Sequence, residues 1–172
     1  MNNIKWLLGL LIIILTFWAS NIYPAELKDE PGIESLRGLK GVCVMVESLG
    51  PSFDGKLTRD KIKIDAELKL KLAGIKVISD REIFHTKAWP ILHISVFSHR
   101  AAGSIGYSIN VALMQLVNLR RDPAKSLLAG TWSTRSAGVI GELQMETLQS
   151  SIKDKVDEFI NDFLSVNPKM GK

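Results

Sequence analysis

The apolar residues near the C-terminus repeat with the period of a helix. Between residues 145 and 163 they recur at steps of three and four, which places them on one face of a helix. Pro168 follows and ends the helix, because proline lacks the amide hydrogen that a helix interior needs. The sequence therefore predicts a long C-terminal helix packed on the core, with an apolar stripe of Met145, Leu148, Ile152, Val156, Phe159, Ile160 and Phe163.

Residues 62–72 carry two conflicting signals. Every even position is apolar, which is the period of a strand. The residues themselves are mostly Ala, Glu, Leu and Lys, which favour helix. Thr58 suits an N-cap, and Gly74 stands where a glycine commonly ends a helix. We therefore predict a helix from Arg59 to Ala73.

The remaining apolar segments have the composition or period of strands. Residues 42–47 are apolar on both faces, as in a strand inside a covered sheet. Residues 107–119 carry a mostly apolar face at their odd positions, and Ser136 to Gly141 is interpreted as a loop. The predicted strands are 42–47, 75–78, 91–99, 107–119 and 126–134, and Asp80 is predicted to cap a short helix that starts at Arg81.

The order of these elements, β-α-β-(α)-β-β-β-α, predicts one α/β domain of the two-layer α+β type over residues 41–166. We expect residues 75–78 to run parallel to the first strand, and the last three strands to form an antiparallel meander. The two main helices then pack on one face of this mixed sheet. Residues 167–172 are expected to form a tail.

The N-terminus carries an uncharged apolar run, residues 6–18, preceded by Lys5. A run of this length is typical of an export signal and short for a membrane span. We predict a signal peptide over residues 1–25, with an uncleaved inner-membrane anchor over residues 4–23 as the alternative. The charged segment 26–40 is interpreted as a linker. The mature domain is thus expected in the periplasm or outside the cell.

Charge and cysteine content narrow the class of protein. The 172 residues include 22 Lys and Arg against 18 Asp and Glu, a net charge of +4. Nucleic-acid binders cluster their cations on one face, and this chain spreads them, so no nucleic-acid partner is expected. Cys43, the one cysteine, lies in an apolar strand and is interpreted as a small buried hydrophobe rather than a reactive thiol.

Templates for catalysis find little support in the sequence. His93 and His99 share a strand face but lie six residues apart, too far to ligate one ion. Ser104 stands in a loose form of the serine-nucleophile motif, Ala102-Gly-Ser-Ile-Gly106, but between two strands rather than before a helix. We predict no catalytic residue, metal or cofactor.

An apolar patch on the open face of the sheet is the candidate binding site. The even positions of the strand 107–119 should face away from the helices, yet Met114 and Leu116 among them are apolar. Trp132 lies between small polar residues of the next strand. Exposed together, Met114, Leu116 and Trp132 would mark a contact for a partner, ligand or membrane. The alternatives are that the linker, a loop or the short helix covers them, or that the faces are reversed.

The stretch from Val42 to Pro168 resembles a group of small exported bacterial proteins of unknown function. The resemblance is carried by three segments and implies no activity. These are Asp65-Ala-Glu-Leu-Lys-Leu-Lys-Leu-Ala-Gly-Ile75, Ala129-Gly-Thr-Trp-Ser-Thr134 and Val156-Asp-Glu-Phe-Ile-Asn-Asp-Phe-Leu164. The element order also resembles small α/β domains of envelope helper proteins, such as the amino-terminal domain of the Tol-system propeller protein and the lipopolysaccharide-assembly lipoproteins.

These observations favour a non-enzymatic binding or adaptor module of the bacterial cell envelope. Its expected partner is an envelope protein or lipid component, near the membrane, and a homo-oligomer is an open alternative. The second hypothesis is a periplasmic carrier of an apolar ligand or lipid held between helices and sheet. The third is a small hydrolase that uses Ser104 with His99.

Overall fold

The structure is a computed structural model that describes residues 31–47, 49, 57–101, 103–141 and 144–168. The predicted signal peptide or anchor lies outside the described residues. Within these ranges no helix is long and apolar enough to cross a membrane. The elements are α2 (Pro31–Glu34), β1 (Cys43–Val46), α3 (Arg59–Leu72), the 3₁₀ helix η2 (Glu82–His85), β2 (Ile91–Ala101), β3 (Ser104–Leu119), β4 (Asp122–Gly141) and α4 (Met145–Val166).

The strands form one mixed sheet in the order β1-β2-β3-β4. β1 runs parallel to β2, whereas β2, β3 and β4 form an antiparallel meander. The α/β fold with a mixed sheet is therefore confirmed. Residues 75–78 lie parallel to the start of β1 as predicted, but they form a single bridge, Val42 to Val77, instead of a strand.

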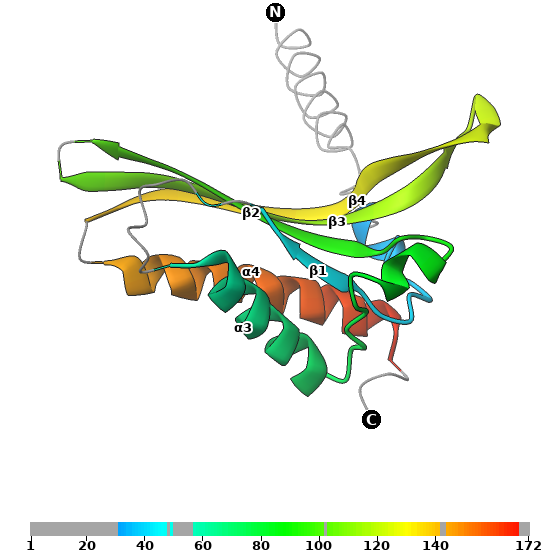
Figure 1. Ribbon diagram of the computed structural model, residues 1–172, viewed down its shortest axis with the longest axis horizontal. Coiled ribbons are helices and arrows are strands. Elements are labelled where there is room, and N and C mark those ends of the chain that lie inside the picture. The colour runs from blue at the N-terminus through cyan, green and yellow to red at the C-terminus, as the bar shows by residue number, and fades with distance from the viewer. Residues whose placement is uncertain (1–30, 48, 50–56, 102, 142–143, 169–172) are drawn as a thin grey trace, which may run out of the picture. The chain divides into compact units, whose positions relative to one another are not determined.

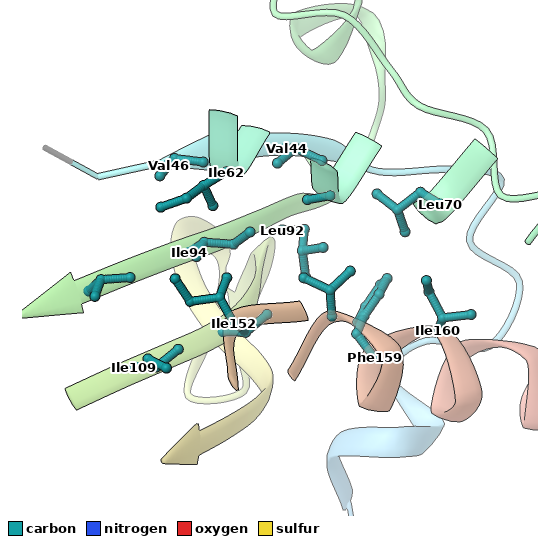
Figure 2. Close-up of a cluster of buried hydrophobic side chains, with 14 of the residues drawn as sticks. Val44, Val46, Ile62, Leu70, Leu92, Ile94, Ile109, Ile152, Phe159 and Ile160 are labelled. Atoms are coloured by element: carbon teal, nitrogen blue, oxygen red, sulfur yellow. The ribbon is translucent and has the colours of Figure 1, made fainter. Parts of the chain in front are cut away.

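Both long helices, α3 and α4, lie against the same face of the sheet (Figure 1). This inner face supplies one side of the core, where Leu92 and Ile94 of β2 meet Ile62 of α3 and Phe159 of α4 (Figure 2). All four side chains are at least 95% buried. Among the described residues, no long helix lies over the opposite, outer face of the sheet, so this face is the place to look for a binding site.

The helix α3 shows how the strand-like pattern of its sequence is resolved. The Thr58 hydroxyl accepts a hydrogen bond from the backbone N–H of Lys61 at 3.2 Å, and Gly74 ends the helix with a φ of +77°. Every fourth residue (Ile62, Ala66 and Leu70) is buried in the core. The other even positions (Ile64, Leu68 and Leu72) fall on the opposite side of the helix and are exposed.

The strand β4 extends through the residues predicted to loop. Ser136 to Gly141 pairs with Ser104 to Ile109 of β3, so the loop prediction is wrong. The small residues serve a packing purpose: a Cβ on Gly138 would lie 2.9 Å from the Tyr107 hydroxyl oxygen. Glycine here leaves room for the Tyr107 side chain to lie across the strand.

The domain is longer at both ends than its sequence suggests. Leu36 is fully buried, so residues 31–40 of the predicted linker belong to the fold. The Asn167 side chain, predicted to be part of a tail, accepts a hydrogen bond from the Gly38 N–H at 2.8 Å. The same side chain donates to the Leu36 carbonyl at 2.9 Å. The two ends of the domain are thereby joined.

Candidate functional site

The predicted patch of Met114, Leu116 and Trp132 does not form, because Trp132 lies on the inner face. Its side chain is 5% exposed and its indole N–H donates a 2.8 Å hydrogen bond to Asp162 of α4. Its ring also meets Phe159 edge-to-face, with ring centroids 5.2 Å apart. The prediction that Trp132 is exposed on the open face is therefore wrong.

The register of β3 and β4 explains this placement. Trp132 lies opposite Leu113, an odd position of β3, and cross-strand partners share one face of a sheet. Immediately beyond this pair the register shifts, because Met114 lies opposite Gly130 and leaves Thr131 as an extra residue in β4. A bulge of this kind cannot be located from the alternation of either strand alone.

Met114 and Leu116 do lie on the outer face, but a cap covers the first of them. The cap comprises residues 78–89, which include η2. Its Ile78, Ile83 and Trp89 form a second apolar cluster with Cys43, Ile91 and Met114. The N–H of Leu116 donates a 2.7 Å hydrogen bond to the carbonyl of Ala88. One alternative considered for this patch, that the short helix covers it, thus applies to Met114.

The start of η2 is capped by Ser79 rather than by Asp80. The Ser79 hydroxyl accepts a hydrogen bond from the N–H of Glu82 at 3.2 Å, and the Glu82 carboxylate accepts one from the N–H of Ser79 at 3.0 Å. This reciprocal pair has the form of a capping box. Asp80 is left to bind Lys63, whose ammonium group lies 3.1 Å from a carboxylate oxygen.

Cys43 lies beneath the cap and donates its thiol hydrogen to Asp80 at 3.4 Å. Burial, together with the neighbouring Asp80 carboxylate, raises the pKa of the Cys43 thiol to about 11. The nucleophile in cysteine chemistry is the thiolate, which is scarce at neutral pH when the pKa is this high. The geometry therefore gives Cys43 a structural role.

We expect the native protein to react very slowly with a thiol reagent at pH 8. Reaction should become fast when the chain is unfolded in guanidinium chloride, or as the pH approaches 11. Absorbance of the released thionitrobenzoate measures the reaction rate under each condition.

The same pKa shift makes the stability of the fold depend on pH. Because the folded-state pKa of Cys43 is raised from 9.0, the protonated thiol stabilises the fold below pH 9, and this contribution is lost between pH 9 and 11. Rapid labelling of native protein at pH 8 would contradict the buried, protonated thiol.

The histidines and Ser104 do not assemble a catalytic group. His99 lies opposite Gly106, and Ser104 lies opposite Ala101, so His99 and Ser104 are diagonal neighbours on the outer face. No hydrogen bond joins them in the described structure. A serine nucleophile needs such a base in contact with its hydroxyl. Across the described ranges, no group of three or more His, Cys, Asp or Glu side chains is arranged to hold a metal ion.

The space between the two helices is too small for an apolar ligand. The cleft between α3 and α4 is lined by Ile62 and Ala66 on one side and by Ile152 and Val156 on the other. It has about 10 Å³ of free volume, which is close to the minimum that holds one water molecule. This cleft between the two helices therefore offers no place for a lipid.

A shallow trough lies on the uncovered end of the outer face. We call it the outer-face trough. Phe97 and His99 of β2 line it on one side and Val139 of β4 on the other. Gly106 and Ser108 of β3 form the floor between them. The trough has a volume of about 580 Å³ and is wide open. Phe97 is 64% exposed and Val139 is 74% exposed.

The register of the strands builds this trough from alternate residues. Phe97, Ser108 and Ala137 form one row across the sheet, and His99, Gly106 and Val139 form the next. Phe97 and His99 of β2 and Val139 of β4 thus flank the small Gly106 and Ser108 of β3. These residues were not predicted from the sequence, because the rows depend on the register of the hairpin, which is centred on the turn at Gly103.

Comparison with known proteins adds no assignment to this geometry. No protein-family model matches the sequence, and no curated protein matches it either.

Proposed function

We propose that this chain is a non-enzymatic binding module of the bacterial cell envelope that captures an extended segment of a protein partner in the outer-face trough. The observation that carries the proposal is the trough itself. Its flanking Phe97 and Val139 expose apolar surface that the fold leaves uncovered. Exposed apolar side chains gathered around one open trough are a mark of a candidate interaction site.

The edge of β4 beside the trough favours an extended segment as the occupant. β4 is the last strand of the sheet, and residues 133–141 contain one charged residue, Arg135, with no proline and no lysine. Natural edge strands usually carry charged residues, lysine above all, or proline, because these prevent pairing with another strand. A strand from a partner can pair with β4 while its side chains enter the trough, as in other complexes formed by strand addition.

The location in the envelope is supported by the sequence. The uncharged run of residues 6–18 after Lys5 has the form of an export signal. The resemblance to small exported proteins points the same way. We therefore place the proposed partner among proteins of the periplasm or of the membrane surface that faces it.

Photocrosslinking in living cells tests this proposal. A photoreactive benzoylphenylalanine is placed at Phe97 or at Val139, and adducts are identified by mass spectrometry. We expect one dominant protein, crosslinked through the same short segment from both positions. Phe84 is the matched control position, because it is 65% exposed and lies in the cap, away from the trough.

Substitution provides the second arm of this test. Phe97→Glu and Val139→Glu are expected to reduce the yield of the adduct formed from the neighbouring position by about tenfold, since an apolar contact is replaced by a charge. Their melting temperatures should stay close to the parent value, because both side chains are exposed. Phe84→Glu should leave the adduct unchanged. Equal crosslinking in all variants would overturn the trough as the binding site.

A further inference from the structure

Helix α3 carries a second apolar stripe that the domain itself does not cover. We call Ile64, Leu68 and Leu72 the α3 ridge. Their exposed fractions are 63%, 53% and 79%, whereas the opposite stripe of Ile62, Ala66 and Leu70 is buried. A surface helix of a globular domain normally has one apolar stripe, facing the core. The three large aliphatic side chains on the solvent-facing side of α3 therefore indicate a site for a partner.

The charges beside the ridge form a regular pattern. Helix geometry places Asp65 and Lys69 along one flank of the ridge, and Glu67 and Lys71 along the other. On each flank the acid precedes the lysine along the chain. These flanks are mixed in sign, so the ridge lacks the cationic border that binds helices to anionic lipid.

From this pattern we infer that the α3 ridge binds the α3 ridge of a second copy of the chain, with the two helices antiparallel. A two-fold axis through Leu68 sets the two Leu68 side chains against each other. Ile64 of each copy then lies on the same side of the axis as Leu72 of the other. Ridges of residues spaced by four pack into the neighbouring grooves at a crossing angle of about 50°, so the helices diverge on either side of Leu68 and the contact is centred there.

The flanking charges select the antiparallel orientation. In this orientation Asp65 comes next to Lys69 of the second copy, and Glu67 comes next to Lys71 of the second copy. In a parallel pair the same geometry sets Asp65 beside Glu67 and Lys69 beside Lys71 across the interface. Like charges in close approach are unfavourable, and opposite charges fix the register of a helix pair. Asp65 and Lys69 also form ion pairs with Lys153 and Asp157 of α4 in the same molecule, at 3.1 and 2.7 Å. Glu67 and Lys71, on the other flank, therefore carry most of the preference for the antiparallel orientation.

The inferred dimer is small and leaves the outer-face trough free. Three ridge residues and their flanks are far fewer than the roughly 20–30 residues on each side of a standard interface, so we expect weak, reversible association. The ridge belongs to α3, which lies on the inner side of the sheet (Figure 1), whereas the rows of residues that form the trough lie on the outer face. A dimer would therefore present two troughs, and loss of the dimer should not abolish capture by a single trough.

Sedimentation equilibrium tests the association, with protein purified from cells that express the full chain. We expect the parent protein to pass from monomer to dimer as its concentration rises toward ~1 mM. Leu68→Glu places two carboxylates at the axis and should weaken the dimer at least about tenfold. Leu68 is half exposed, so circular dichroism and the melting temperature should not change. A parent protein that stays monomeric over this range would overturn the inference.

Charge exchange tests the orientation. Lys71→Glu should weaken the dimer, because two glutamates then meet across the interface, and adding Glu67→Lys should restore it. The exchanged pair also keeps its spacing of four within one helix, so the fold is preserved. Failure of the double variant to recover the dimer would overturn the antiparallel arrangement.

Disulfide crosslinking tests the dimer in intact cells, without purification. Leu68→Cys should form a covalent dimer when a mild oxidant is added, since the two introduced sulfurs lie at the axis and the buried Cys43 does not compete. The control is Phe84→Cys, a comparably exposed position off the ridge. Equal dimer yields at the two positions would mean random collision and would count against the interface.

Discussion

Replacing Trp132 with glutamate is expected to unfold the domain. The substitution removes a buried aromatic side chain, and loss of such a side chain to alanine alone costs about 3–5 kcal/mol. It also buries a carboxylate next to Asp162, the residue that accepts the indole hydrogen bond in the parent protein. The added desolvation and repulsion bring the loss to the scale of the whole folding free energy of a domain, about 5–15 kcal/mol. Near-ultraviolet circular dichroism and the yield of soluble protein measure the effect.

Two variants on the same sheet show whether the cause is burial of Trp132. Trp132→Phe keeps most of the apolar contact and loses the bond to Asp162, so a cost of about 1–2 kcal/mol is expected. Leu128→Glu alters a residue of β4 that is 44% exposed and should cost less than about 1 kcal/mol. Cooperative melting of Trp132→Glu close to the parent temperature would show that Trp132 is not packed under α4.

The substitution Gly41→Ala is expected to destabilise the domain by about 1–3 kcal/mol, through overlap with the backbone. A Cβ at this position would lie 2.4 Å from the carbonyl oxygen of Lys76. That oxygen also accepts a hydrogen bond from the N–H of Val42 at 3.0 Å. Any movement that relieves the overlap therefore weakens the bridge between Val42 and Val77. Urea unfolding measures the loss of free energy.

Gly106→Ala is the matched control for this prediction. A Cβ on Gly106 would meet no atom closer than 3.8 Å, so its effect should stay within about 0.5 kcal/mol. Amide hydrogen exchange adds a local reading. The Val42 and Ile78 amides, which bond across the bridge, should exchange faster in Gly41→Ala. Parent-like stability together with unchanged exchange of these two amides would contradict the close approach.

The helices were predictable because local signals agree with their packing. The stripe from Met145 to Phe163 specifies α4 directly, and all seven of its predicted core residues are buried. For α3, helix-forming residues, a Thr58 cap and Gly74 outweighed an alternating pattern. The same alternation still had a structural meaning, since it distributes apolar residues to two opposite faces of one helix.

The candidate binding face was less predictable, because it depends on contacts between strands. Alternation within β3 identifies its inner residues, but only the register with β4 places Trp132 beside Leu113. The extra residue Thr131 then changes the alternation of β4. The loop prediction over Ser136 to Gly141 failed for a related reason. Glycine favours turns locally, whereas Gly138 serves the distant ring of Tyr107.

The parallel pairing of β1 with β2 has a consequence for the route by which the chain folds. Ala101 and Ser104, which pair in the first hairpin, are three positions apart, whereas Cys43 and Ile91 are 48 positions apart. With a closure entropy that grows as the logarithm of loop length, joining β1 to β2 costs about 2.5 kcal/mol more than closing the hairpin. We therefore expect the meander of β2, β3 and β4 to form first, because it costs less chain entropy. β1 is expected to join later, since the residues that it pairs are farther apart in the sequence.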